Sequence, residues 1–283
     1  MRVLRPALIG NARAGNLLMQ APLPPIAPVG RAITATSWVA YMGIVLFQEN
    51  GIAPGNGALH TSMETIMEAV NLSLNFWLVL PSIAPSMAPV VDPSLEALFN
   101  VLICWALGFW GLVADEKEYE YPGGMMPYLT GALFLTNVFY LPMVALRKPR
   151  EGAALDEARA APLTVVQRLG ESRALAFLCG VIVPALAILW GLEGRADVFP
   201  STGLEARFST LATMVSSDRL AFSFAADMLT FALFQGALIP ADAARRNVEL
   251  GSLSVQVARF VPFVGLTFWL LSRPPLPLMD RDD

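Results

Sequence analysis

The sequence predicts an all-α protein, a polytopic transmembrane helix bundle of about seven spans. Composition is the first reason: 55% of the 283 residues are hydrophobic and 15% are charged, with a mean hydropathy of +0.55. Soluble domains carry about 25% charged residues. The second reason is that several apolar runs approach the roughly 20 residues that a helix needs to cross a bilayer.

Seven apolar segments follow one another along the chain. They cover about residues 32–48, 62–80, 95–113, 126–146, 174–192, 219–239 and 250–271. The first is short and is followed by Gln48 and Glu49, so six spans remain an alternative. Prolines follow the second segment closely and are expected to end its helix near Leu80. In the last segment, Pro262 cannot donate a backbone hydrogen bond, which predicts a hinge there.

The remaining regions divide the chain. Residues 1–31 contain arginines and no acid, which is typical of a transit peptide; an ordinary tail on the inner side is the alternative. Residues 32–148 are expected to hold the N-terminal membrane helices and 149–173 a basic loop on the inner side. Residues 174–275 are expected to form a C-terminal three-helix membrane domain, followed by a tail over 276–283.

The distribution of basic residues sets the expected orientation. With seven spans, the arginine-rich tail, the 147–173 loop and the pair Arg245–Arg246 fall on one side, which is therefore the inner side. The loop over 114–125, with Lys117, falls on the opposite side. Aromatic residues near that opposite interface would be Trp110, Tyr128, Trp190 and Trp269.

The sixth segment has two different faces. Asp227 lies near its middle, and an acid at that depth is costly and therefore a candidate functional residue. Ser223 and Thr230 share its face. Small residues at helical spacing lie nearly opposite and predict close helix packing: Ala221, Ala225, Ala232 and Gly236. A helix with both faces occupied is expected to be central in the bundle.

Arg259 in the last segment is the obvious partner for Asp227. The depths of the two residues allow an ion pair, but side chains tilt towards the N-terminus of their own helix, so these two lean apart. The tilt favours an Arg259 that extends to the inner interface. In that case Asp227 is protonated or meets Asn, Ser or Thr partners.

The second segment carries a polar stripe. Glu68, Asn71 and Asn75 follow Glu64 at spacings of three and four, which places them on one helix face. Such a stripe is expected to face protein or water rather than lipid. Interhelical hydrogen bonding is the favoured interpretation, and a cavity, a pigment ligand or an ion path is the alternative.

The sequence contains no recognisable catalytic set. It lacks the phosphate loop, the zinc-protease motif and the nucleophile elbow. The acidic run over 115–120 is interpreted as a solvated loop, although it weakly suggests a lipid enzyme. Cys104 and Cys179 are expected to be small core residues, and His60 a surface residue. Scattered basic residues argue against nucleic acid as a partner.

The C-terminal third resembles an uncharacterised family of small membrane proteins from bacteria and cyanobacteria, with plastid members, over about residues 174–275. The matching residues are Phe224, Ala225, Ala226, Asp227, Met228, Arg245, Arg246 and Arg273. Ala221 and Pro274 depart from the family pattern. The stretch from Asn71 to Phe109 is similar to plastid membrane proteins that carry this domain. The resemblance and the acid-free leader together suggest a chloroplast membrane; a bacterial inner membrane is the alternative.

These observations lead to two functional hypotheses. The first is a non-enzymatic structural or assembly partner of a larger membrane complex in the thylakoid or envelope, with other membrane subunits as partners. In a photosynthetic complex it would be expected to bind chlorophyll or carotenoid. The second is a small transporter or channel that uses Asp227 and the Glu68–Asn71–Asn75 stripe.

Overall fold

Helices dominate the structure, a computed structural model that describes residues 28–276. They make up 72% of these described residues. Five helices are long and apolar enough to cross a membrane, or six if one bent pair counts as a span. The helical class is therefore confirmed, with five or six candidate membrane spans, and the expected count of seven is not. Most of the predicted leader and nearly all of the predicted tail lie outside the described residues.

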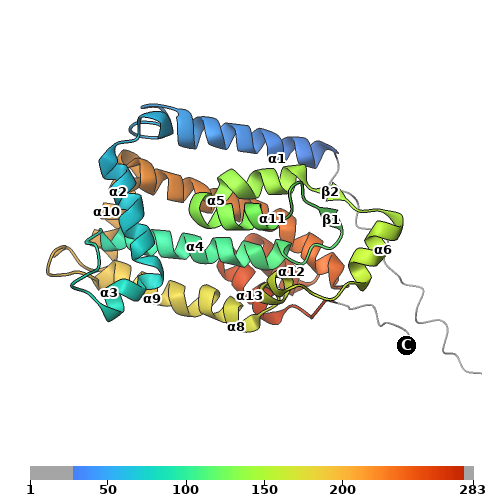
Figure 1. Cartoon of the computed structure of the whole chain (residues 1–283). Helices are drawn as coiled ribbons and strands as arrows, with labels where there is room; N and C mark the ends of the chain where they lie inside the picture. The colour runs from blue at the N-terminus through green and yellow to red at the C-terminus, as the bar shows by residue number, and fades with distance from the viewer. Residues whose placement is uncertain (1–27, 277–283) are drawn as a thin grey trace, which may run out of the picture.

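Four helical columns run side by side along the long axis of the molecule (Figure 1). They are α1 (Pro28–Tyr41) continued by the π-helix η1 (Met42–Phe47), α4 (Pro93–Val113), α8 (Arg173–Phe177) continued by the π-helix η4 (Leu178–Ile182) and α9 (Val183–Glu193), and α11 (Arg219–Arg245). In the 18-residue apolar window of α4, 61% of the residues are buried, against 17% in the first column. Column α4 is therefore central and the first column peripheral.

Helix α5 (Met126–Leu146) is not a straight span. Leu135 and Thr136 leave helical backbone angles and divide it into two arms. The strand before it, β1 (Tyr119–Glu120), pairs with the strand after it, β2 (Lys148–Pro149), so both ends of α5 lie together. A Cβ on Gly131 would lie 2.5 Å from the Phe139 ring, so the arms lie against each other. Each arm has the length of about half a bilayer core. Helix α5 is a re-entrant hairpin.

A second hairpin is formed by α12 (Leu253–Phe260) and α13 (Val264–Ser272). The chain reverses at Val261–Phe263, where Phe263 has a φ of 57°. A Cβ on Gly265 would lie 2.5 Å from the carbonyl oxygen of Val257, so the two helices touch through backbone. The predicted hinge at Pro262 is thus a full reversal. The segment 250–271 was wrongly predicted to be one span.

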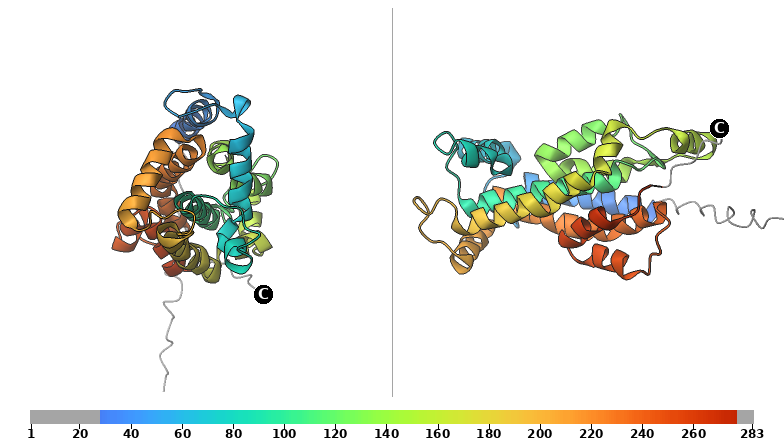
Figure 2. Two further views of the ribbon diagram at one scale, coloured as in Figure 1. Left: turned by 90° about the vertical axis from the view of Figure 1, so that its left-hand side faces the viewer. Right: turned by 90° about the horizontal axis from the view of Figure 1, so that it is seen from below.

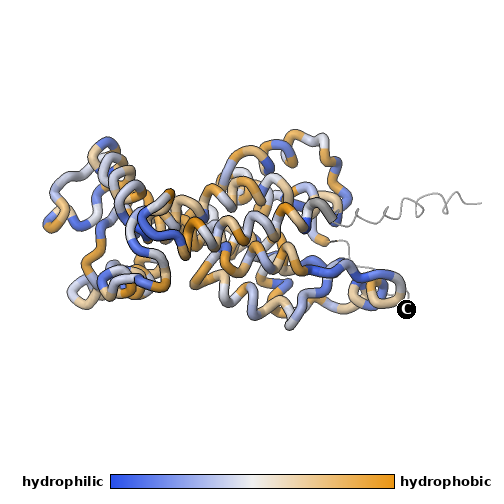
Figure 3. Tube along the Cα trace, turned by 90° about the horizontal axis from the view of Figure 1, so that it is seen from above, coloured by the Kyte–Doolittle hydropathy of each residue, from blue (hydrophilic) through white to orange (hydrophobic). Residues whose placement is uncertain are grey.

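The ends of the bundle differ. One end, here called the cap end, carries α10 (Leu204–Ser217) together with η2 (Ala58–His60), α2 (Met63–Leu74), η3 (Phe76–Leu78) and α3 (Val79–Ile83). Helix α2 crosses this end rather than running along the bundle (Figures 1 and 2). The other end, here called the charged end, carries β1, β2, α6 (Gly152–Ala160) and α7 (Val165–Gly170). Hydrophilic stretches lie towards both ends, and hydrophobic residues predominate between them (Figure 3).

Aromatic rings fill the centre of the bundle. Phe231 of α11 packs between Phe109 and Tyr140, with ring centroids 4.7 and 5.8 Å away, and Trp105 lies 6.0 Å from it. Ring pairs at these separations add stability beyond the burial of their surface. This core draws on α4, α5 and α11–α13, and therefore on both sides of the 149–173 loop.

The re-entrant hairpin corrects the predicted topology. The loop over 114–125 was assigned to the side opposite the arginine-rich loops, but Glu116 is bonded to Arg147 and Arg245 at the charged end. Trp269 also lies at that end, where its indole bonds Asp242. Of the four predicted belt residues, Trp190 is the one that lies at the cap end, beside Glu96. The side that carries most basic residues is still the inner side, because moving the 114–125 loop to it only adds Lys117.

Candidate functional site

Helix α11 brings a polar side chain to the break of each hairpin. Asp227 meets the break of α5, and Gln235, about two turns later, meets the break between α12 and α13. Both are buried, with exposed fractions of 4% and 0%. A reversal inside a membrane protein leaves backbone groups without helical partners, and side chains on a neighbouring helix can satisfy them.

The Asp227 carboxylate is held by neutral donors. Its Oδ1 accepts a hydrogen bond from the Tyr41 hydroxyl at 2.8 Å and another from Asn137 Nδ2 at 2.7 Å. Asn137 also approaches the Asp227 backbone carbonyl at 3.3 Å. No arginine or lysine in the described part of the chain pairs with this acid. One of the sequence interpretations, an Asp227 that meets a neutral polar partner, therefore matches the structure.

Each partner of Asp227 comes from a helix discontinuity. Tyr41 is the last residue of α1, directly before the π-helix η1. Asn137 opens the second arm of α5, where the free N–H groups give the arm a partly positive end. Short π-helical segments often occur at functional sites. Broken helices inside a membrane bundle occur where they are buried in protein or line a cavity, and in transporters they form substrate and ion sites.

Gln235 satisfies the other break completely. Its Nε2 donates to the carbonyls of Ala258 at 2.6 Å and Val261 at 2.9 Å. Its Oε1 accepts from the backbone N–H of Phe263 and from the Trp105 indole, each at 3.2 Å. All the hydrogen-bonding capacity of the amide is directed at protein groups, so Gln235 is a structural residue.

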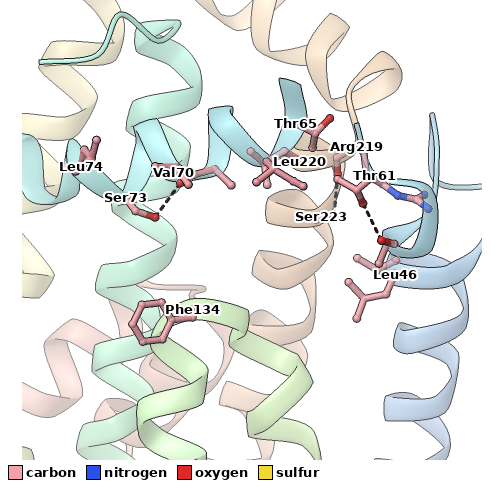
Figure 4. Close-up of a pocket in the computed structure, with 14 residues that line it drawn as sticks. Leu46, Thr61, Thr65, Val70, Ser73, Leu74, Phe134, Arg219, Leu220 and Ser223 are labelled. Atoms are coloured by element: carbon pink, nitrogen blue, oxygen red, sulfur yellow. Dashed lines mark hydrogen bonds between the residues drawn. The ribbon is translucent and has the colours of Figure 1, made fainter. Parts of the chain in front are cut away.

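A cavity of about 590 Å³ lies on the cap side of the α5 hairpin. Its walls come from η1, α2, the start of α11 and the hairpin tip, which carries Phe134 (Figure 4). Ser223 lines the cavity and lies four residues before Asp227 on α11. The cavity therefore ends about one helical turn from the buried carboxylate.

The other predicted polar residues of this region do not join Asp227. Ser223 and Thr230 donate to carbonyls of their own helix, those of Arg219 at 2.7 Å and Ala226 at 2.8 Å. Arg259 donates through Nε to the Gly236 carbonyl at 3.1 Å and lies over the Phe260 ring. The ion pair with Asp227, which the tilt argument disfavoured, is absent.

The predicted stripe on α2 lies away from Asp227, because α2 crosses the cap end. Asn75 is fully buried and donates to Glu96 and to the Pro89 carbonyl. Glu96 also accepts from Trp190, and Arg195 lies 3.4 Å from it. Glu68 and Asn71 are half-buried. Asn75 therefore fixes packing at the cap end, as the hydrogen-bonding interpretation expected.

The small residues of α11 differ in their packing. Ala221 is fully buried against a cluster that includes Leu72 and Leu95. Ala232 is half-buried against the central core. A Cβ on Gly236 would lie 3.8 Å from the Arg259 carbonyl, so α12 passes close to the helix there. Ala225 is half-buried.

Eight charged residues form a network at the charged end, and all of them are buried except the half-buried Glu171. They are Asp115, Glu116, Glu171, Asp242, Arg147, Arg245, Arg246 and Arg273. Four negative and four positive side chains balance. Asp242 is the hub: it accepts from Arg245 at 2.9 Å, Arg273 at 3.0 Å and the Trp269 indole at 2.6 Å. The network joins α4, α5, α11 and α13.

The acidic run over 115–120 was wrongly interpreted as a solvated loop. Asp115 and Glu116 are 1% and 2% exposed. Their arginine partners on α11 lie about 130 positions away, so the pairing depends on both helices ending at the same face of the bundle. The sequence offered one signal for this pairing. An acidic pair, Asp115–Glu116, follows one apolar run, and a basic pair, Arg245–Arg246, follows another.

The network shifts the titration of its members outside the helices. Burial raises the pKa of Asp115, and the charge of Asp242 adds to this. For Glu116, burial also acts to raise the pKa, but the charges of Arg147 and Arg245 outweigh it and lower the pKa. Burial is likewise outweighed at Glu171, whose pKa is lowered by hydrogen bonding from Arg246 and by the charge of Arg273.

Within residues 28–276 no group of three or more His, Cys, Asp or Glu side chains is arranged to hold a metal ion. The acids of the charged end are occupied by arginines, and Cys104 and Cys179 are buried in the core. Asp227 is therefore the candidate functional residue: a buried carboxylate without a cationic partner, held at the meeting of two helix breaks.

Comparison with known proteins leaves the family resemblance of residues 174–275 as a prediction. No protein-family model, curated protein or solved structure matches the chain.

Proposed function

We propose that this membrane protein transports a small cation and that Asp227 is the group that binds it. The proton is the first candidate for this cation. The observation that carries this proposal is the Asp227 carboxylate at the break of the α5 hairpin, held by the neutral donors Tyr41 and Asn137. Ionisable residues inside a membrane bundle usually mark ion pathways or proton relays. A carboxylate without an arginine partner can gain or lose a cation without breaking an ion pair.

The two sides of Asp227 differ in a way that suits such a role. Towards the cap end, the cavity reaches Ser223, one turn from the carboxylate. Towards the charged end, the eight-residue network closes the bundle. These two features support a transport cycle in which Asp227 is reached from the cap side in this state, as alternating access requires.

Reconstituted vesicles test the proposal. Purified protein in liposomes loaded with a pH-sensitive dye should dissipate an imposed proton gradient faster than empty liposomes. Asp227→Asn should reduce the rate to that of empty vesicles, because the amide cannot carry the charge. The amide oxygen can still accept from Tyr41 and Asn137, so the fold should persist.

Asp156→Asn is the matched control, since Asp156 is an exposed acid on α6. Its gradient dissipation should equal that of the wild type. Equal rates for wild type and Asp227→Asn, at equal amounts of folded protein, would rule out the proposed role of Asp227.

A second candidate is the structural or assembly partner of a larger membrane complex. The first column favours it, because only 17% of its residues are buried and Ile33 and Val39 are 60% and 63% exposed. In a complex, this face would contact another subunit. Purification in mild detergent should then yield a stoichiometric partner, which Val39→Ser weakens; a monomer without partners would contradict it.

The expected plastid location and pigment binding belong to this second candidate. A fluorescent fusion of the full chain should locate to plastid membranes if residues 1–31 are a transit peptide. The absorption spectrum of the purified protein should show chlorophyll or carotenoid bands if it serves a photosynthetic complex. A spectrum with aromatic absorption alone would remove pigment from the proposal.

A further inference from the structure

The cavity on the cap side of the α5 hairpin exists because each arm of that hairpin has only about half the length of a membrane span. The hairpin reverses at Leu135 and Thr136, so its tip, Phe134, forms part of the cavity wall instead of continuing across. A full-length helix would occupy this place. At about 590 Å³, the cavity has the size of sites for small ligands, which span roughly 300–1,000 Å³.

The lining shows which chemistry fits. Most of it is apolar, and Phe134, Leu74 and Ile66 remain 78%, 54% and 44% exposed. In a bilayer such side chains would face hydrocarbon rather than water. Hydroxyl groups from Thr61, Thr65, Ser73 and Ser223 are spread around these apolar residues.

Arg219 is the one charged side chain among the lining residues of this cavity. Its Nη2 donates to the Gln48 carbonyl, whereas its buried Nη1 has no hydrogen-bond partner within residues 28–276. Glu49, the acid whose charge acts on Arg219, is itself paired with His60. A guanidinium with an unused donor binds carboxylate or phosphate well.

We propose that the cavity binds one membrane lipid with a single chain and an anionic head group. The chain would lie along the apolar walls of α2 and the hairpin tip, and the head group would accept from Arg219. The volume of about 590 Å³ favours one chain over two. This site goes beyond cation transport at Asp227, and its binding can be measured without any flux.

Equilibrium binding to the detergent-purified full chain tests this inference, with radiolabelled lysophosphatidic acid as the probe. One molecule should bind per protein. Lysophosphatidylcholine of the same chain length and two-chain phosphatidic acid should bind at least about tenfold more weakly, because each lacks one of the two matched features. Equal binding of all three lipids would overturn the proposal.

Two variants locate the site. Arg219→Gln should lower the affinity for lysophosphatidic acid about tenfold or more, the loss expected for one charge-assisted hydrogen bond, and should remove the preference over lysophosphatidylcholine. Arg168→Gln, an exposed arginine outside the cavity, is its control and should bind as the wild type does.

Ala69→Trp fills the cavity and should abolish binding, whereas Ala212→Trp, on the exposed face of α10, should not. Unchanged affinity in both Arg219→Gln and Ala69→Trp would show that the lipid binds elsewhere. If the Ala69→Trp variant fails to fold, the affinity of the Arg219→Gln variant alone decides whether the lipid binds in this cavity. Asp227→Asn should bind the lipid normally, so failure of transport and failure of lipid binding remain distinguishable.

Discussion

The charged end and the hairpin breaks solve the same problem of burying polar groups in opposite ways. At the charged end, carboxylates are held by arginines: Asp242 alone contacts Arg245, Arg246 and Arg273. At the break of α5, Asp227 is held by a tyrosine and an asparagine. A buried ion pair is costly to disrupt, because the remaining partner is left as an unpaired charge. A carboxylate with neutral partners can change its charge more easily.

This difference assigns separate roles to the two regions. The charged end is a structural clamp that joins the ends of four membrane helices and balances its own charge. The break of α5 is the place where, in the proposed function, charge changes within the bundle. The predictions below test this division, in order of decreasing effect.

Asp242→Asn should be the most damaging single change. It removes the negative hub and leaves arginines buried without their partner, which costs about 3–5 kcal/mol of the free energy of unfolding. Asp227→Asn should cost about 1 kcal/mol, because its neutral donors keep an acceptor. Thermal unfolding in one detergent measures both. A larger loss for Asp227→Asn would reverse the roles of the two regions.

Gln235→Leu should have the next largest effect. It leaves the carbonyls of Ala258 and Val261 and the N–H of Phe263 without their partner. Unsatisfied buried groups of this kind cost about 1–3 kcal/mol each, and local relaxation reduces the sum to about 2–3 kcal/mol. Thermal unfolding again provides the measurement, and Gln256→Leu, on α12 but not at the break, is the control. Equal midpoints for the two variants would mean that Gln235 does not hold the hairpin.

Gly131→Ala should test the α5 hairpin itself. Its new Cβ would meet the Phe139 ring at 2.5 Å, and overpacking of this kind typically costs about 1–3 kcal/mol. In a straight helix, residues 131 and 139 would be about 12 Å apart and the change would be harmless. Gly43→Ala, where nothing lies within 4 Å of the new Cβ, is the control. A Gly131→Ala protein as stable as Gly43→Ala would favour a straight span.

The loss of stability at acidic pH should be the smallest of these effects. Glu171 has a lowered pKa in the folded protein, so its contribution is present above its ordinary value of 4.5 and is lost as the pH falls through the folded value. The unfolding temperature of the wild type should therefore drop below about pH 4.5. The unfolding temperature of the Glu171→Gln variant should drop less over the same range. Glu157 is an exposed acid on α6, so the Glu157→Gln variant should follow the wild type. Parallel curves for all three would exclude Glu171 as a contributor.

The sequence predicts the helical class of the fold and the burial of Asp227 well. Asp227 is buried, as its depth indicated, but α11 is not the central helix that the sequence predicted: 28% of its apolar window is buried, and Leu229 and Leu233 are 64% and 68% exposed. The α5 hairpin is harder to predict, because an apolar run of 21 residues has the length of a span whether it is straight or folded back. The break has no glycine or proline, and its one signal is the polar pair Thr136–Asn137 in the middle of the run.

The other hairpin and the charged network show different limits. Pro262 identified the hinge between α12 and α13 but not the size of the turn, which depends on Gln235 from another helix. The network could not be predicted without the hairpin. Once α5 returns to the end where it began, the acids after α4 and the arginines after α11 lie on one side.

Direct observation of the Asp227 carboxyl group tests the central claim most sharply. Infrared difference spectra between neutral and acidic pH report the C=O stretch of carboxyl groups that take up protons. The wild type, reconstituted in lipid, should show a buried carboxyl band that shifts in deuterated water and is missing in Asp227→Asn but present in Asp156→Asn. Identical difference spectra for the wild type and Asp227→Asn would mean that Asp227 does not exchange a proton, and would contradict the account.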